Sequence, residues 1–453
     1  MWWTARSSSV DPQSVSARRG LDRAIWRLGL PAFGALVAHP VFLLIDAAIV
    51  GTLGTAPLAG LGAATTVISA VVGLCVFLAY ATTSSVARLL GANDRAGALA
   101  QGLAGMLLGL GLGVVLGIAV WWSAPLLASG LGTTGEVTDF SVTYLRIIAI
   151  SLPAMLGVLA GVGVLRGLQD TKTTLVVTLS QVGVNLVLSL VLVLGLGWGI
   201  AGSAVGTAVA EFVGLFAYGA VLILLVRRDG VPVVPTMAGI VRAARDGVPL
   251  FIRTIALRIV FLVAAAAAAR LGSPELAAYH VTATLFFALA LALDALAIAG
   301  QALLGKVLGA SDAHSARLIT RRLLYWSVWL GLALAVFVLA IRPWLPGWFS
   351  DDEAVIAIMS CALIIVAVQQ PLAGAVFAID GILIGAGDTR FLAWAQIAVL
   401  GGFIPAAWWV VQSGWGVDGL WWAIAWFLLL RLTILGWRAH GSAWIVTGAV
   451  RQR

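Results

Sequence analysis

Charged residues are scarce in this sequence. Asp, Glu, Lys and Arg make up 10% of the 453 residues, whereas soluble globular proteins carry roughly 25%. Hydrophobic residues make up 61%, and the mean hydropathy is +1.06. A water-soluble globular domain is therefore excluded, and the composition predicts an all-α polytopic membrane protein.

Cysteine is nearly absent as well. Cys75 and Cys361 both lie in apolar runs, and two isolated thiols provide neither a disulfide framework nor a metal site. The sequence also has no His/Cys metal cluster, no paired catalytic carboxylates and no nucleophile motif. We therefore expect neither an enzyme nor a bound metal or cofactor.

Long apolar runs, in contrast, are abundant. A run of about 20 apolar residues is the signal for a transmembrane helix. The sequence predicts twelve such helices, at 31–53, 62–86, 99–127, 141–165, 173–196, 200–226, 248–270, 277–305, 319–342, 357–384, 391–412 and 418–438.

The loop charges predict the orientation of these helices. Basic residues gather in the loops that follow the even-numbered helices, for example Arg88 and Arg95, whereas acids mark the odd loops at 132–139 and 350–354. The positive-inside rule then places both termini in the cytoplasm, with the protein in the plasma membrane. The net charge of +8 is thus a topology signal, and no nucleic-acid partner is expected.

The chain contains an internal repeat with a fixed offset. Five pairs of motifs occur in the same order in the two halves: Pro31 and Pro249, 91–94 and 309–312, Pro153 and Pro371, 170–172 and 388–390, and 197–202 and 414–419. The first four pairs share one sequence offset, and the offset of the fifth pair is one residue shorter. Because each half has an even number of helices, the two six-helix bundles form a parallel repeat. Such repeats are typical of transporters, with the substrate site near the interface of the halves.

The repeat predicts five segments. They are a cytosolic N-terminal tail at 1–28, which lacks a signal-peptide apolar core, an N-lobe at 29–226, a cytosolic linker at 227–247, a C-lobe at 248–440 and a cytosolic C-terminal tail at 441–453.

These motifs resemble a known family. "VFLLIDAAIVGTLG", "LLGAND", "VLRGLQDTKT" and "AIDGILIGAGDTR" are similar to motifs of the multidrug and toxic compound extrusion (MATE) family, and most similar to its DinF-type branch. The resemblance covers nearly the whole chain. It implies a V-shaped, two-lobed exporter of twelve helices that exchanges incoming protons or sodium ions for outgoing organic molecules, usually cations.

The run "LLIDAAIVG" at 43–51 places one carboxylate, Asp46, within the first predicted helix. An acid at the centre of such a helix costs about 2.5–3.5 kcal/mol on insertion scales, so it usually marks a functional site. By resemblance, Asp46 is the first-helix carboxylate at which the family binds its coupling ion. The alternative is a structural acid that is hydrogen-bonded to the fifth predicted helix.

That fifth helix carries Gln181, Asn185 and Ser189 at positions i, i+4 and i+8, on one face. They are candidates for the substrate and ion cavity, although such side chains also join helices. The family usually has an Asp at the position of Ser189. The missing carboxylate favours protons over sodium ions as the coupling ion.

The second half holds another set of polar residues. Asp294 and Gln301 share a helix face, with His280 close to the same stripe, and Asp380 lies in a later helix. By resemblance, Asp380 occupies the position of a family carboxylate, and Gln301 stands where relatives often have an acid. Asp294 and Asp380 are further candidates for proton or cation coupling. Gln301, Arg258 and His280 are further candidates for the substrate and ion cavity.

Two arginines accompany these acids. Counted from the cytoplasmic helix ends, Arg258 lies about 15 Å deep, Asp294 about 16 Å and Asp380 about 10 Å. An arginine at that depth needs a partner, so we expect Arg258 to meet both acids inside the C-lobe, as an ion pair whose carboxylates can be released by protonation. A static buried salt bridge is the alternative. Arg253 is expected to extend to the membrane interface.

The sequence as a whole predicts a secondary active antiporter that works by alternating access. It would export organic, cationic or amphipathic compounds in exchange for protons or sodium ions, as a monomer whose partners are its small-molecule substrates and the lipid bilayer. A flippase for a lipid-linked precursor, of the same superfamily, and a non-transporting membrane scaffold are the alternatives.

Overall fold

The computed structural model describes residues 12–230 and 236–449, and within these ranges all the regular secondary structure is helical, with no β-strand. Twelve helical segments in the described residues are long and apolar enough to cross a membrane, which confirms the prediction of an all-α fold with twelve spans. The elements are α1 (Pro12–Gly51), α2 (Thr55–Leu74), α3 (Phe77–Gly91), α4 (Arg95–Gly130), α5 (Glu136–Gly167), α6 (Thr171–Ser189), the π-helix η1 (Leu190–Gly195), α7 (Gly199–Asp229), α8 (Met237–Leu271), α9 (Ser273–Gly309), α10 (Ala313–Ile341), the short α11 (Leu345–Phe349), α12 (Glu353–Gly385), α13 (Thr389–Ser413) and α14 (Gly416–His440).

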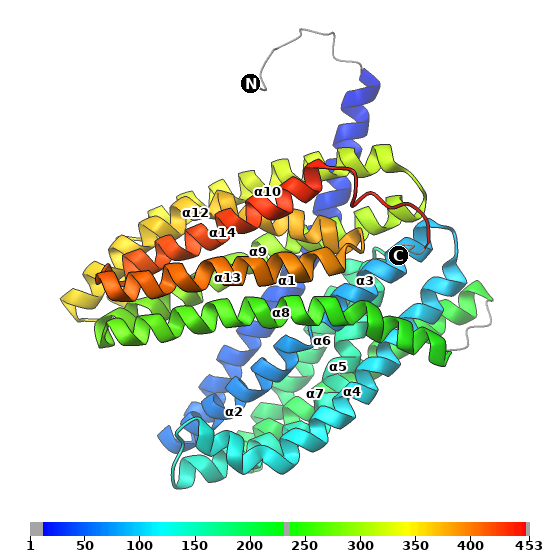
Figure 1. Ribbon diagram of the computed structural model, residues 1–453. Helices are drawn as coiled ribbons and strands as arrows, with labels where there is room; N and C mark the ends of the chain where they lie inside the picture. The colour runs from blue at the N-terminus through cyan, green and yellow to red at the C-terminus, as the bar shows by residue number, and fades with distance from the viewer. Residues whose placement is uncertain (1–11, 231–235, 450–453) are drawn as a thin grey trace.

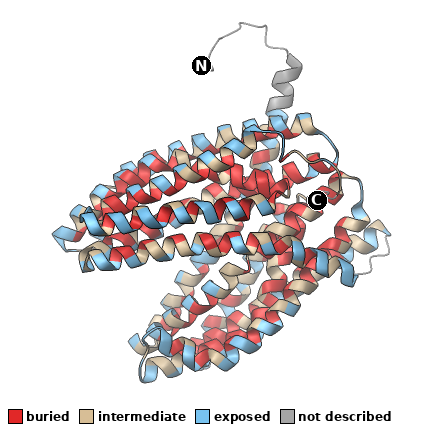
Figure 2. Ribbon diagram, viewed as in Figure 1, coloured by how far each residue is buried: buried red, intermediate tan, exposed pale blue. Residues whose placement is uncertain are grey.

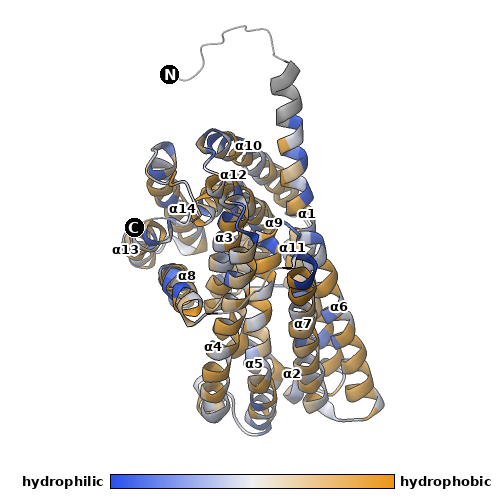
Figure 3. Ribbon diagram, turned by 90° about the vertical axis from the view of Figure 1, so that its right-hand side faces the viewer, coloured by the Kyte–Doolittle hydropathy of each residue, from blue (hydrophilic) through white to orange (hydrophobic). Residues whose placement is uncertain are grey.

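The helices form two bundles that approach each other at one end and diverge at the other (Figure 1). The N-lobe consists of α1 to α7 with η1, and the C-lobe of α8 to α14. We call the end with loops 92–94 and 310–312 the closed end, and the end with loops 131–135 and 350–352 the open end. Buried residues fill the interior of each bundle (Figure 2), and most residues of the helices are hydrophobic (Figure 3).

The sequence repeat reappears in the backbone. Asn93 and Ser311, which occupy equivalent positions of the two repeats, have φ values of 57° and 62°. Gln169 and Gly387, a second equivalent pair, have φ values of 63° and 68°. Left-handed residues of this kind end helices, so the repeated motifs form equivalent corners in the two lobes.

An aspartate begins the next helix at these corners. Asp94 accepts a hydrogen bond from the Gly97 amide at 2.7 Å, and Asp312 accepts one from the Ser315 amide at 2.9 Å. These bonds satisfy backbone donors that are otherwise free in the first turn of a helix. The "GAND" and "GASD" motifs are therefore a helix stop followed by a helix start.

The lobes touch most closely where α3 and α9 cross near the closed end. A Cβ atom at Gly91 would lie 1.9 Å from the Lys306 carbonyl oxygen, and one at Gly309 would lie 2.0 Å from the Arg88 carbonyl oxygen. Gly91 and Gly309 are repeat partners, as are Arg88 and Lys306. The contact is thus reciprocal, and only glycine allows the two backbones to come so close.

Helix α1 of the N-lobe also contacts the C-lobe. Near its start, Asp22 accepts hydrogen bonds from Arg322 and from the Trp326 indole nitrogen at 2.7 Å, both on α10 of the C-lobe. Trp26 stacks edge-on against Trp326, with 5.4 Å between the ring centroids. The far end of α1 carries Asp46 into the N-lobe.

The predicted boundaries differ from the structure mainly at the basic segments. Parts of the predicted tail 1–28 and linker 227–247 lie outside the described residues, and most of their described parts are helical. Helices continue past the apolar runs because backbone hydrogen bonding does not stop where the apolar residues do. The predicted C-terminal tail packs on the bundle up to residue 449: Trp444 is buried, and Arg88 donates a hydrogen bond to the Gly448 carbonyl at 3.2 Å.

Candidate functional site

A cavity of about 470 Å³ lies between the lobes, with walls from α1, α2 and α8. Its size is typical of a small-molecule site. Asp46 lines it from α1, Thr65 and Thr66 line it from α2, and Arg258 lines it from α8. The cavity therefore brings one acid of the N-lobe and one base of the C-lobe into the same space.

Asp46 is 2% exposed and is surrounded by neutral donors. The Ser203 hydroxyl on α7 lies 2.8 Å and 3.0 Å from its two carboxylate oxygens, and the Ser189 hydroxyl on α6 lies 3.4 Å from one of them. Among the described residues, no ion pair involves Asp46. The carboxylate is thus held in place by hydroxyl groups, without a neutralising cation.

A ladder of polar contacts continues from Asp46 between α6 and α7. The Ser189 hydroxyl lies 3.1 Å from the Asn185 side-chain oxygen, and the Asn185 amide donates to the Thr207 hydroxyl at 3.0 Å. One turn further, the Gln181 amide donates to the Glu211 carboxylate at 3.1 Å. The predicted face of Gln181, Asn185 and Ser189 therefore meets a matching face of α7.

This matching face of α7 was not predicted from the sequence. Ser203, Thr207 and Glu211 are spaced i, i+4 and i+8, as are the three residues of α6. Glu211 is a second acid inside a spanning helix of the N-lobe, where only one had been expected. The spacing and the intramembrane acid were both visible signals.

The C-lobe acid Asp380 forms a different kind of site. Arg253 donates to it through Nε at 3.2 Å and through a second nitrogen, and a guanidinium nitrogen of Arg431 lies 3.1 Å from one of its carboxylate oxygens. All three side chains are buried. Asp380 is therefore held between two guanidinium groups, and the expectation that Arg253 extends to the membrane interface is wrong.

The expected meeting of Arg258 with Asp294 and Asp380 is also wrong. Arg258 is exposed to the interlobe cavity, and no ion pair involves it among the described residues. Five residues of α-helix turn by about 140° beyond a full circle, so Arg253 and Arg258 face different sides of α8. Depth counting gave their height along the helix but not the direction in which they point.

Asp294 lies at the seam between the lobes. It faces Tyr80 of α3, whose hydroxyl is 3.5 Å from the carboxylate, and the guanidinium groups of Arg166 and Arg253. Gln301 is fully buried two turns further along α9. His280 is exposed, about 21 Å from Asp294 along the helix axis. It therefore lies outside the cluster around Asp294, contrary to the prediction that grouped the two residues.

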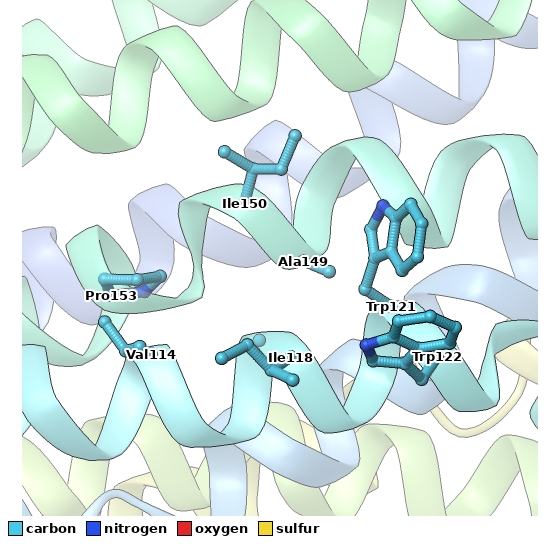
Figure 4. A pocket seen from close by; sticks show the side chains of 8 residues that line it. Val114, Ile118, Trp121, Trp122, Ala149, Ile150 and Pro153 are labelled. Carbon is cyan, nitrogen blue, oxygen red and sulfur yellow. The ribbon is translucent and has the colours of Figure 1, made fainter.

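A second cavity, of about 230 Å³, is not a candidate site. Figure 4 shows it between α4 and α5, lined by apolar side chains that include Val114, Ile118, Trp122 and Ile150. These four side chains are exposed on the outer surface of the bundle. The groove therefore suits lipid chains better than a polar cargo.

Comparisons with known proteins agree with this architecture. A family model described as MatE matches residues 31–191 and 249–409, two segments that repeat the offset between Pro31 and Pro249. Protein DETOXIFICATION 43 of Arabidopsis thaliana is 29% identical to this chain, covering 93% of it and 91% of the relative. DNA damage-inducible protein F of Escherichia coli K12 is 28% identical, covering 92% of each chain.

Solved structures show the same fold. A multidrug resistance MATE family transporter of the MOP superfamily in an outward-facing conformation superposes with a TM-score of 0.84 at 21% identity, over 96% of this chain and 99% of the other. A MOP superfamily transporter from Pyrococcus furiosus gives a TM-score of 0.85 at 22% identity, over 96% of this chain and 99% of that one.

Proposed function

Since the chain belongs to the multidrug and toxic compound extrusion (MATE) family of membrane transporters, we propose that it is a secondary active antiporter. It exports amphipathic organic compounds in exchange for protons, as a monomer in the plasma membrane. The two lobes rock about the closed end, so that the cavity opens alternately to each side. Protons rather than sodium ions are proposed because the Asp46 site contains a single carboxylate.

The observation that carries this proposal is the setting of Asp46. Burial away from water disfavours the charged form of a carboxylic acid unless a cation compensates it. Within the described part of the chain, the hydrogen-bond partners of Asp46 are hydroxyl groups, and Asp46 lines the interlobe cavity. It is thus placed to exchange a proton and to contact a cargo from the same position.

Asp380 is less suited to this role. Two guanidinium groups bind its carboxylate, and protonation would leave both buried positive charges without their counter-ion, which is costly. We assign Asp380 to a permanent internal salt bridge of the C-lobe, and Asp46 to proton coupling.

The orientation follows from the basic loops. Arg88, Arg95 and Lys306 lie at or beside the closed end, and the positive-inside rule places that end in the cytoplasm. The cavity then opens to the outside, and both termini are cytoplasmic. A proton that enters from there gains about 2.3 kcal/mol per 100 mV of membrane potential.

The test uses purified protein in proteoliposomes, with a proton gradient or a sodium gradient imposed one at a time. We expect transport of a fluorescent organic substrate with the proton gradient alone. Asp46→Asn should abolish proton-driven transport, while Asp46→Glu, which keeps the titratable group, should retain part of it. Undiminished proton-driven transport by Asp46→Asn would refute the role of this carboxylate.

A further inference from the structure

The interlobe cavity has opposite charges on opposite walls. Asp46 stands on the N-lobe wall and Arg258 on the C-lobe wall. Counted from the open ends of their helices, Asp46 lies about 8 Å deep and Arg258 about 20 Å deep. The charges are thus separated both across the cavity and along it, and no direct ion pair joins them among the described residues.

No hydrogen bond or ion pair of Arg258 is found within residues 12–230 and 236–449. Its guanidinium group lies directly over Gly73 of α2, where a Cβ atom would be 2.0 Å from one of its nitrogens. The glycine leaves room for the group but supplies no negative charge. At about 20 Å from the helix end, the side chain is too deep to reach the membrane surface. An arginine at such a depth requires a partner, and the cavity is the place where one can bind.

Each wall rejects one class of singly charged cargo. A simple organic cation would be attracted to ionised Asp46 but repelled by Arg258. A simple organic anion would be attracted to Arg258 but repelled by ionised Asp46. A molecule with a cationic group and an anionic group at separate positions satisfies both walls and carries no net charge into a low-dielectric space.

We propose that the preferred cargo is a zwitterionic amphipathic molecule, with its anionic group at Arg258 and its cationic group at Asp46. The proposal rests on the proposed function and names its substrate class. It also supplies the competition that antiport needs, because a proton on Asp46 removes the attraction for the cationic group while Arg258 still orients the other end. Thr65 and Thr66 lie on the α2 wall, and their hydroxyl groups donate to backbone carbonyls of their own helix, so they offer oxygen atoms rather than competing charges.

The test compares two probes that differ in one group. Rhodamine 110 carries a free carboxylate and is zwitterionic at neutral pH, whereas rhodamine 123 is its methyl ester and is cationic. Equilibrium binding to the purified full-length protein is followed by fluorescence polarisation. We expect the wild type to bind rhodamine 110 at least about tenfold more tightly, which corresponds to 1.4 kcal/mol.

Arg258→Gln should remove that preference by weakening the binding of rhodamine 110 and not that of rhodamine 123. Arg258→Lys should keep part of it. Arg270→Gln, an exposed arginine at the open end of the same helix, is the matched control and should keep all of it. Equal affinities of the wild type for the two probes, binding of neither, or an equal loss of both in Arg258→Gln would each overturn the proposal.

Proton-driven uptake of the same probes is measured separately in proteoliposomes. A selective binding site without proton-driven movement would reject the antiport function and leave the zwitterion site standing. Proton-driven uptake without selective binding of rhodamine 110 would support the antiport function and reject the zwitterion site.

Discussion

The crossing of α3 and α9 near the closed end allows a sharp test of how the lobes move. Replacing Gly91 by alanine puts a methyl group 1.9 Å from the Lys306 carbonyl oxygen. The obstacle is backbone, so no side-chain rotation can relieve it. A carbon atom approaches a carbonyl oxygen comfortably at about 3.3 Å, and the two helices must therefore move apart by about 1.4 Å.

In the proposed rocking motion, the cost of this displacement falls on one conformation only. Overpacking of a tight contact typically costs about 1–3 kcal/mol, and we expect the state with the closed end sealed to bear it, whereas a state with that end parted would not. A difference of this size changes the ratio of the two states about 5- to 150-fold. Gly309→Ala, which meets the Arg88 carbonyl at 2.0 Å, should act in the same direction.

The assay measures distances between spin labels across the open end. The chain has two cysteines, Cys75 and Cys361, so a cysteine-free background needs two substitutions before labels are placed at positions 129 and 413. We expect Gly91→Ala to shift the distance distribution towards shorter values, as the open end narrows when the closed end parts.

Gly130→Ala is the matched control. Gly130 is also the last residue of a helix, and no heavy atom lies within 4 Å of the position that its Cβ would occupy. It shares the general gain in helix propensity of about 1 kcal/mol that alanine has over glycine. If Gly91→Ala gives the same distances as Gly130→Ala, the closed end does not control the opening.

Three further predictions concern single acids. Asp380→Asn leaves two buried guanidinium groups without a counter-ion and should cost about 3–5 kcal/mol of stability. Arg253→Gln leaves one ion pair intact and should cost about 1.5–3 kcal/mol. The measurement is thermal unfolding in detergent followed by tryptophan fluorescence, and an equal loss of stability in the two variants would contradict the prediction. Glu211→Gln keeps the size of the side chain but removes its titratable carboxyl group, so the pH profile of transport in proteoliposomes should lose one ionisation. An unchanged pH profile would mean that Glu211 only packs the two helices together. At the start of α10, hydrogen bonds from the Ser315 hydroxyl and amide lower the pKa of Asp312. The stability that this cap provides should therefore persist at neutral pH and disappear only as the pH falls through the lowered pKa. Asp312→Ala should cost about 0.5–2 kcal/mol of unfolding free energy at pH 7 and nothing at a pH below that pKa, as measured by unfolding at both pH values.

The fold was predictable because the bilayer simplifies the problem. Apolar runs of spanning length gave twelve helices, and the constant offset between the motif pairs gave two equivalent bundles. The repeated corner motifs were recognised in the sequence, but their role in ending one helix and starting the next was not. That role depends on the left-handed backbone conformation of Asn93 and Ser311, which the residue types alone do not specify. Helix starts were predicted too late, most of all at α1, which begins at Pro12 rather than at Pro31, because helices continue through charged segments.

The candidate site was predictable only in part. The interval of four residues correctly placed Gln181, Asn185 and Ser189 on one face, and the lone acid in an apolar run pointed to Asp46. Pairings between helices depend on rotation about each helix axis, which hydropathy does not fix. For that reason Arg258 was assigned to the wrong partners. Glu211 could have been predicted, because it is an acid inside an apolar span and lies at the same four-residue spacing as Ser203 and Thr207.

The first helix couples distant parts of the molecule. It is anchored to one bundle through Asp22 and Trp26, and it delivers Asp46 to the other, about 36 Å along the same rod. Any movement of one bundle relative to the other must therefore bend helix α1. Pro31 and Pro40 lie between its two anchored ends, and each lacks the amide that would brace the preceding turn. The helix is weakest there, so we expect the proposed swing to bend α1 at those turns, and substitutions there to change its stiffness.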